Sequence, residues 1–398
     1  MNRRIITPCN IYVGLWLLII MNPTLSIMPD SLSIMLLFLL FAWSLIYAAK
    51  FSLQKNVPQY IKVLNVLFAL FSIYGFIRIV GGETYSIWIS GNNTPVGPRE
   101  FLISYWRSIL PIYAFLYFTK KGYLTARGII IWTFIFLVLA IIAFYGEESQ
   151  RMANLSVGAL QDGVTNNQGY AILSILPLIA FFRKKPVLQY SLFGVILVFS
   201  IMSYKRGTIL IAIVSIILGI ILLWKNSNRL SFLKGFVLAC LLFLGAYYLI
   251  NWNMENNSYF MMKLDRTISG DDSGRRMIYS RLLDYLFHQT SFFRLLFGAG
   301  ADATFKIVGQ AAHNDWLELS VDIGLVGLLA YIFYFIYFFR LLLDSKHCGE
   351  EINQCVLYLF IFCFLRSFFS MSINDMSLYL TMALGYSVSA VYYSESRQ

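Results

Sequence analysis

Long apolar runs alternate with short polar segments along most of the chain. Each run is close to the ~20 residues that a helix needs to cross a bilayer, whereas the strands of a membrane barrel alternate in polarity and are about half as long. The pattern therefore predicts an all-α, polytopic membrane helix bundle of about twelve transmembrane helices. The predicted spans are residues 11–28, 31–49, 61–80, 101–118, 129–145, 168–182, 188–204, 207–224, 232–250, 323–339, 354–369 and 376–393. The first run, Ile11 to Met28, lacks a small-residue cleavage site and leads directly into another run, so we expect a retained helix rather than a signal peptide.

One long hydrophilic segment, residues 251–322, interrupts this pattern. It is far longer than an ordinary connection, and such loops are usually functional or disordered. Ile278, Leu282, Tyr285 and Leu286 recur in it at helical spacing, which argues against disorder. We therefore expect short helices here, one of them amphipathic and lying on the membrane surface, and we expect this loop to carry the function. The chain then has three parts, which are residues 1–250 with nine spans, residues 251–322, and residues 323–398 with three spans.

Composition and charge support a membrane protein and orient it. Apolar residues make up 59% of the chain and charged residues 13%, against about 25% in soluble domains, and the mean hydropathy is +0.68. Short cytoplasmic loops collect Lys and Arg. With both termini in the cytoplasm, the cytoplasmic segments hold 17 of the 31 basic residues and four acidic ones, so that side carries +13 and the rest −2 of the net +11. The positive charge then faces anionic lipid, and we expect the bilayer rather than a nucleic acid as its partner.

Cysteine, glycine and carboxylate patterns indicate no metal or cofactor. The five cysteines form no metal or redox motif, and none lies in the large loop. Gly298, Gly300 and Ala303 fit the dinucleotide pattern G-x-G-x-x-A, but the strand and helix that this motif needs are absent, so a tight turn is the better interpretation. Asp271 and Asp272 could pair around a divalent ion, but only Ser and Gly accompany them, which favours a solvated turn.

Two cations lie between two apolar runs, on the predicted extracytoplasmic side, where positive residues are uncommon. Lys205 and Arg206 occupy the short break 203–207 at the predicted outer membrane face. Positive residues are uncommon on that side, so we expect something to compensate them, and an anionic ligand at the interface would do so. The alternative is a hairpin turn whose long side chains extend to the interface.

A second basic feature opens the predicted amphipathic helix. Arg275 falls within the apolar sector of the helical wheel, Arg276 follows it, and Arg281, Asp284 and His288 fall on the opposite, polar side. A planar guanidinium suits bidentate binding of phosphate, so these cations near the lipid boundary are what a membrane-bound pyrophosphate would require. The alternative is that Arg275 frays at the start of the helix.

The third feature is His313, which precedes the helix that leads into the predicted span 323–339, on the extracytoplasmic side. A neutral imidazole within reach of an acceptor hydroxyl could serve as a general base. Asn314 could support it or could simply be an N-cap. Asp315, Glu318 and Asp322 lie within about a 60° arc on a helical wheel. They could orient a base or a sugar, but a solvated helix face is the favoured interpretation.

These separated pieces resemble the O-antigen ligase and O-antigen polymerase superfamily of bacterial envelope enzymes. His313-Asn314, followed after nine residues by Gly324-x-x-Gly327, looks like the signature of that family. Three further pieces look like its other motifs: Ser273-Gly274-Arg275 with Tyr279 where Trp is usual, the turn Phe297-Gly298-Ala299-Gly300, and Ser203-x-x-Arg206-Gly207, one residue longer than the usual form. The resemblance covers mainly residues 160–340.

The resemblance implies a GT-C-type fold and transfer of glycans from an undecaprenyl-diphosphate carrier in the bacterial inner membrane, without a metal, cofactor or nucleotide sugar. By similarity, Arg206 and Arg275, with Lys205 and Arg276 beside them, would bind the donor diphosphate. His313 would activate the acceptor hydroxyl, supported by Asn314, Asp315, Glu318 and Tyr279.

The resemblance leaves the acceptor open. Typical ligases of this family follow the second glycine with Thr-Thr, whereas this chain has Leu328-Leu329, which favours a polymerase whose acceptor is another lipid-linked repeat unit. The alternatives are a ligase that transfers the glycan to the lipid A core and, less favoured, a transporter of the lipid-linked glycan. A chain-length regulator is a candidate partner of a polymerase.

Overall fold

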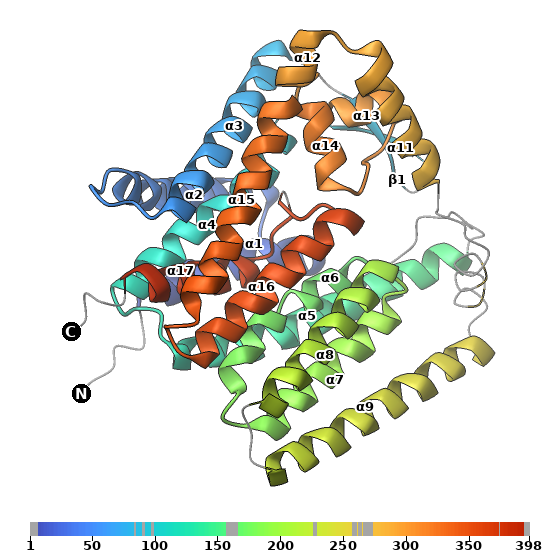
Figure 1. The fold of residues 1–398 in the computed structure, drawn as a ribbon. Coiled ribbons are helices and arrows are strands. Elements are labelled where there is room, and N and C mark those ends of the chain that lie inside the picture. Colours follow the sequence, from blue (N-terminus) through green and yellow to red (C-terminus); the bar gives the residue numbers. More distant parts are fainter. Residues whose placement is uncertain are drawn as a thin grey trace.

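The computed structural model of the chain describes residues 7–82, 85–89, 92–96, 99–156, 166–225, 229–256, 261, 265, 274–373 and 375–393. These residues are mainly helical, and one antiparallel hairpin joins β1 (Tyr85–Ile89) to β2 (Asn92–Val96) (Figure 1). The helices before residue 260 are α1 (Pro8–Leu25), α2 (Asp30–Ser52), α3 (Gln59–Gly81), α4 (Glu100–Lys120), α5 (Ala126–Ser156), α6 (Gln168–Leu173), η1 (Leu176–Phe182), α7 (Pro186–Met202), α8 (Arg206–Lys225) and α9 (Arg229–Asn256). The later ones are α11 (Arg275–Asp284), η2 (Tyr285–Gln289), α12 (Phe292–Phe297), α13 (Ala303–Val308), α14 (Asp315–Asp322), α15 (Gly324–Ser345), α16 (Glu350–Phe369) and α17 (Leu378–Tyr393). The predicted all-α fold class is confirmed.

Several of these helices have the length and composition of membrane spans. Within the described residues six qualify, namely α2, α3, α4, α5, α15 and α16, and α1, α6 with η1, α7 and α8 are shorter apolar helices. The chain is therefore a multi-pass membrane protein. The count of twelve spans stays a prediction.

The predicted span 168–182 is not one regular α-helix. It consists of α6, two turn residues and the 3₁₀ helix η1, in which Pro177 occupies the first turn. Proline has no amide hydrogen, so it cannot continue the α-helical hydrogen bonds from α6. A 3₁₀ helix rises about 2.0 Å per residue against 1.5 Å in an α-helix, so the change lengthens the segment by about 3 to 4 Å. The segment 168–182 can thus cross most of a bilayer core although it has fewer than the ~20 residues that an α-helix needs.

The centre of the bundle is the contact between α4 and α17. A Cβ atom on Gly385 would lie 2.6 Å from the carbonyl oxygen of Ile112 and 2.7 Å from the Cβ of Phe115. Gly75 of α3 meets Leu102 of α4 in the same way, with a Cβ distance of 2.9 Å. Small residues let membrane helices approach closely, where dispersion forces and not the hydrophobic effect hold them together. These glycines therefore set the spacing of α3, α4 and α17.

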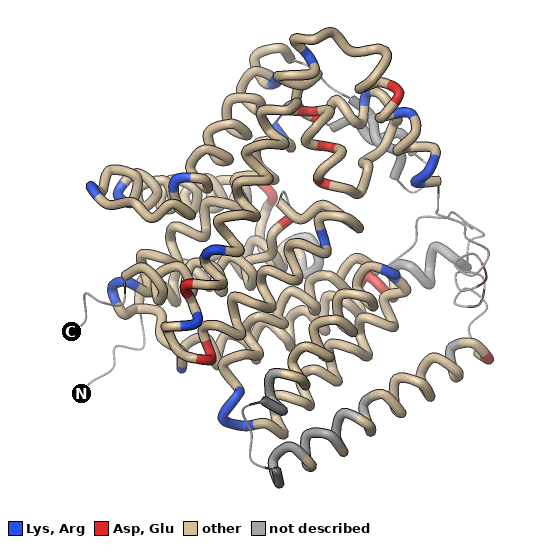
Figure 2. The backbone as a smooth tube through the Cα atoms, in the orientation of Figure 1, with Lys and Arg blue, Asp and Glu red and all other residues tan. Residues whose placement is uncertain are grey.

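Two segments that the predicted orientation places in the cytoplasm, around residues 184 and 350, lie at the same end of the bundle. At one end Arg183 forms an ion pair with Glu350, and Lys184 Nζ lies 3.6 Å from Glu351 Oε1. Figure 2 shows other charged residues at the opposite end, along α14 and near the end of α16 and the start of α8. We call this second end the cap end. Which side of a membrane each end faces stays a prediction.

The described part of the large loop folds into a compact unit, residues 274–323, which we call the cap. Its small apolar core contains Ile278, Leu282, Ala303, Ala312 and Val321. Two contacts fix the cap to α3: Arg78 forms a buried ion pair with Asp302, and the Tyr74 hydroxyl donates to the carbonyl oxygen of Phe297. The expectation that this loop is ordered and contains short helices is confirmed for these residues.

The predicted amphipathic helix is present, but its apolar face does not lie free. Ile278 and Leu282 of α11 are buried against α13 and α14, so the periodic stripe is part of the cap core. The exposed apolar side chains are instead Phe287, Phe292 and Phe293, which are 75%, 76% and 69% exposed. Placing the stripe itself on the membrane surface is therefore wrong, because neighbouring helices of the cap already cover it.

Candidate active site at the cap end

Two glycines bring the 203–207 turn against α6 and α16. A Cβ atom on Gly207 would lie 2.3 Å from the Tyr170 hydroxyl and 3.0 Å from the Cβ of Phe369. A Cβ atom on Gly169 would lie 2.4 Å from that of Ser203. Ser203 donates from Oγ to the carbonyl of Ser200 at 2.7 Å, which closes the end of α7. The Ser and Gly positions of the motif thus build a tightly packed turn that presents the residues between them.

Lys205 of this turn contacts two residues near the start of α6, Asn167 and Tyr170. Its Nζ donates to Asn167 Oδ1 and lies 5.3 Å from the centroid of the Tyr170 ring. Burial, with smaller contributions from the charges of Arg366 and Arg275, lowers the pKa of Lys205 to about 8, although Glu147 and Asp375 oppose the shift. Cations from two distant segments thus act on Lys205.

Arg275 joins the cap to the end of α16. It is the first residue of α11, after Gly274 in the left-handed region at φ 77°. Its Nη2 donates to the carbonyl oxygen of Phe369 at 3.2 Å. Carbonyls at a helix C-terminus carry partial negative charge and favour a cation there. The alternative of a frayed Arg275 is therefore wrong: this guanidinium is held in place.

Arg366 is a third cation that the sequence interpretation missed. It belongs to α16, is 3% exposed, and donates from Nη1 to the Asp375 carbonyl at 2.9 Å and from Nη2 to the Asp375 carboxylate. Its guanidinium lies 4.7 Å from the Tyr170 ring centroid, on which Lys205 also rests. Among the described residues, Arg366 Nε has no hydrogen-bond partner. The available signal was one arginine inside the otherwise apolar run 354–369.

His313 lies near these cations and has an unusual backbone conformation. Its φ is 53°, in the left-handed region, where non-glycine residues are uncommon. Enclosure by surrounding protein lowers the pKa of His313 to about 4, and the charges of Arg275 and Lys205 contribute, although part of the side chain stays exposed. The imidazole is therefore neutral at pH 7, as a general base must be before it accepts a proton.

Two residues of α14 fix the turn that holds His313. Asn314 is the N-cap, because its Oδ1 accepts from the Leu317 amide at 3.1 Å. Glu318 Oε1 accepts from the Ala312 amide at 2.7 Å, and the His313 backbone also hydrogen bonds to this carboxylate. The N-cap interpretation of Asn314 is confirmed, and Glu318 acts on the backbone around the histidine.

The three carboxylates of α14 are not a solvated helix face. Asp315, Glu318 and Asp322 are 2%, 7% and 7% exposed. Asp315 accepts from the Tyr331 hydroxyl at 2.6 Å and from the backbone amide of Ser372, while Asp322 accepts from the amide and hydroxyl of Thr304 at 2.9 and 3.0 Å. Burial raises the pKa of Asp315 and of Asp322 to about 7. The solvated-face interpretation is therefore wrong: Asp315 connects the cap to Tyr331 and Ser372, and Glu318 and Asp322 bond within the cap.

The remaining predicted site residues are partly or largely exposed. Arg206 begins α8 and Arg276 follows Arg275 in α11, and both side chains are exposed. Tyr279 is half-buried and packs on the cap core. The predicted motif residue Ser273 and the pair Asp271 and Asp272 lie outside the described residues.

The backbones at Gly298 and Gly324 are in close contact. A Cβ atom on Gly298 would lie 2.2 Å from the carbonyl oxygen of Asp322, and one on Gly324 would lie 2.4 Å from the Gly298 amide nitrogen. Both glycines have positive φ, 81° and 72°, and Ala299 donates to the Val321 carbonyl at 2.8 Å. The predicted tight turn is confirmed, and its place against the start of α15 explains why two glycine motifs far apart in sequence are both needed.

The assembled site thus holds three cations and one neutral imidazole at one end of a membrane helix bundle. Such a group can bind an anion of more than one charge and can accept a proton beside it. Within the described residues, no three His, Cys, Asp or Glu side chains are grouped to hold a metal ion. A comparison with protein-family models and with curated proteins finds no match for this chain.

Proposed function

We propose that this protein is a glycosyltransferase that polymerises undecaprenyl-diphosphate-linked repeat units of a bacterial envelope polysaccharide, namely O-antigen, capsule or exopolysaccharide. In this proposal the helices form a GT-C-type bundle of twelve spans in the inner membrane, with both termini cytoplasmic and the cap on the extracytoplasmic side. The reaction would use neither a metal nor a nucleotide sugar.

The arrangement that supports this proposal is the grouping of cations from three distant parts of the chain. Lys205 and Arg366 lie 5.3 and 4.7 Å from the centroid of the Tyr170 ring, and Arg275 donates to the carbonyl oxygen of Phe369 at the end of the helix that carries Arg366. Lys205 and Arg275 both lower the pKa of His313, and Arg275 lowers that of Lys205. Mutual repulsion of this kind is unfavourable in the free protein, and a bound diphosphate would relieve it. The site is thus suited to a ligand that carries several negative charges beside a hydroxyl.

In the proposed reaction, the His313 imidazole takes the proton from the acceptor hydroxyl as the acceptor oxygen attacks the anomeric carbon of the donor sugar. The bond between that carbon and the diphosphate oxygen breaks, and the electron pair leaves with the diphosphate. Lys205, Arg275 and Arg366 would stabilise the growing negative charge, which is commonly the largest contribution to such catalysis. The cap supplies His313 and Arg275, and the bundle supplies the other two.

The acceptor decides between polymerase and ligase. Leu328-Leu329 supports a polymerase, for which the donor and the acceptor are both lipid-linked glycans and a chain-length regulator is a candidate partner. The alternative ligase would use the lipid A core with the same donor site. Offering each acceptor separately to the purified protein distinguishes the two.

The test compares His313→Ala with His288→Ala in the full chain reconstituted in lipid nanodiscs. His288 is the other histidine of the cap, is exposed, and lies 3.0 Å from Asp284, so it is a matched control away from the cations. With lipid-linked repeat units supplied, we expect His313→Ala to lose about 10²- to 10⁴-fold in transfer rate while donor binding is retained, and His288→Ala to stay within about twofold. Equal activity of the two variants would remove the general base from the proposal. Transport of the donor without any glycan product would favour a carrier.

A further inference from the structure

Among the residues that the structure describes, one arginine inside a membrane-spanning helix has no side-chain partner. Arg107 belongs to α4, and none of the described residues hydrogen bonds to its side chain or forms an ion pair with it. A charged side chain at membrane depth is costly and usually marks a functional group with a partner. An anionic ligand from outside the chain would balance this charge.

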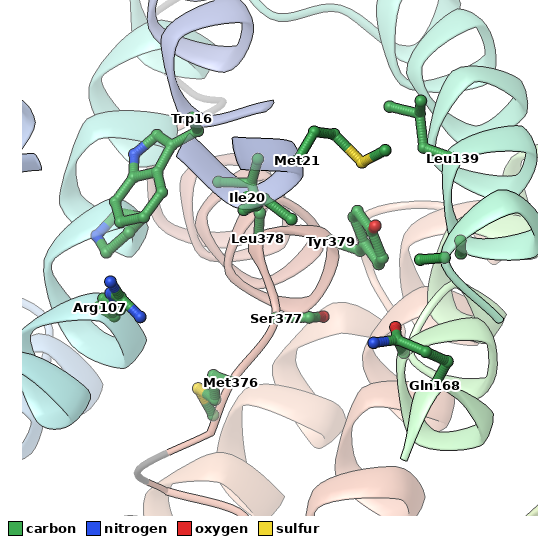
Figure 3. Close-up of a pocket in the computed structure, with 14 residues that line it drawn as sticks. Trp16, Ile20, Met21, Arg107, Leu139, Gln168, Met376, Ser377, Leu378 and Tyr379 are labelled. Carbon is green, nitrogen blue, oxygen red and sulfur yellow. The ribbon is translucent and has the colours of Figure 1, made fainter. Parts of the chain in front are cut away.

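Arg107 lines a cavity of about 230 Å³ between α1, α4, α5, α6 and α17 (Figure 3). The walls are mainly apolar and include Trp16, Leu139, Ala143 and Tyr379. At roughly 30 Å³ for each water-sized group, the cavity has room for about seven or eight such groups, a short length of hydrocarbon chain. A guanidinium beside an apolar cavity matches a molecule with an anionic head and an apolar chain.

The depth of Arg107 fits the head of a membrane lipid. It lies seven residues after Glu100, or about 10 Å along α4 from the cap end, and the long side chain can extend back toward the interface. The next residue, Ser108, accepts from the Met376 amide at 3.0 Å, which places this level beside the 370–377 loop. The lipid phosphates lie in the interfacial layer just outside the hydrocarbon core, within reach of this side chain.

The charge of the cavity distinguishes its ligand from that of the catalytic site. The cavity has one cation, Arg107, whereas Lys205, Arg275 and Arg366 lie together at the other site. A single guanidinium matches the single negative charge of a phosphodiester, and three cations match a diphosphate. We propose that Arg107 and this cavity bind a phosphodiester-headed anionic phospholipid of the bilayer, with its phosphate on Arg107 and the start of its chain against Trp16.

This lipid would support the catalytic site without belonging to it. Gln168 and Met376 line the cavity, and each adjoins a residue that contacts a cation of the site: Asn167 accepts from Lys205, and Asp375 accepts from Arg366. An occupied cavity therefore fixes the two segments that hold these acceptors in place. Lys205, Arg275 and Arg366 do not line the cavity, so lipid binding at Arg107 does not require the transferase reaction.

The experiment places the full chain in phosphatidylcholine nanodiscs that contain a small fraction of phosphatidylglycerol with brominated chains, which quench tryptophan on contact. Trp16 lines the cavity, so Trp16→Phe isolates its share of the quenching. We expect Arg107→Gln to weaken the preference for phosphatidylglycerol about fivefold, the effect of one basic residue near the surface. The matched control Arg127→Gln, in α5 and not among the residues that line the cavity, should leave the Trp16 share of the quenching unchanged.

A second variant tests the chain-binding part separately. Ala143→Leu places a larger apolar side chain in the cavity and leaves Arg107 intact, so it should reduce Trp16 quenching by every brominated lipid. Unchanged quenching in both Arg107→Gln and Ala143→Leu would overturn the proposal. Displacement of phosphatidylglycerol by an equal amount of undecaprenyl diphosphate would also overturn it, by assigning the cavity to the carrier lipid.

Discussion

The lowered pKa of Lys205 predicts that kcat/KM falls at high pH because this lysine loses its charge. With a pKa of about 8, Lys205 is about 90% charged at pH 7, about half charged at pH 8 and about 10% charged at pH 9. If its charge is needed to bind the donor diphosphate, kcat/KM should fall about tenfold per pH unit above pH 8. On the acid side, His313 with a pKa of about 4 should lose half of its base form at pH 4. We therefore expect a plateau between about pH 5 and pH 7.

The assay is the initial rate of glycan transfer at low donor concentration, measured from pH 3 to pH 10. Lys205→Arg keeps the charge at every pH in this range, so the basic limb should disappear while the acid limb remains. Because the bound diphosphate favours the charged forms of both groups, the limbs of kcat should lie at higher pH than those of kcat/KM. A basic limb at pH 8 that persists in Lys205→Arg would refute the assignment, and the reasoning from mutual repulsion would fail with it.

Two further predictions concern stability. Burial raises the pKa of Asp315 to about 7, so the stability linked to its protonation is full below about pH 4 and is lost as the pH rises through 7. If Asp315 titrates alone, the free energy of unfolding should differ by on the order of 4 kcal/mol between pH 4 and pH 8, and Asp315→Asn should remove this difference. SDS unfolding at the two pH values measures it, and an unchanged difference in the variant would contradict the prediction. In the cap, Gly298→Ala places a Cβ 2.2 Å from the Asp322 backbone, whereas Gly300→Ala meets nothing within 4 Å and is strained only by its φ of 109°. The first should therefore destabilise by about 1–3 kcal/mol more than the second, and equal SDS midpoints would show that the overlap is relieved cheaply.

The features that depend on local periodicity could be predicted from the sequence. Apolar runs give membrane helices because a helix satisfies its own backbone hydrogen bonds within lipid. The helical spacing of Ile278 and Leu282 likewise gave α11, because a short helix must bury one face. The turn at Gly298 followed from its glycines. Each of these inferences needs only residues that are close in the sequence.

The features that depend on distant partners could not be predicted. Asp315 looks like part of a polar helix face until Tyr331 and the backbone at Ser372 are placed against it. Arg78 pairs with Asp302, which is 224 residues away. Arg366 was passed over because one charge in an apolar run changes its hydropathy very little. Burial of a charged group is decided by the tertiary neighbours that compensate it, and these are invisible to periodicity.

The candidate centre is divided between the cap and the bundle, and this division has a genetic consequence. His313 and Arg275 belong to one part, Lys205 and Arg366 to the other, and the bond from Arg275 to Phe369 and those from Asp315 to the 372–373 backbone join them. A lesion at this seam can leave both halves folded and still abolish turnover, because neither half holds a complete set of groups. Suppressor mutations of such a lesion should then map to the facing half, which would make selection for restored growth a direct way to chart the seam.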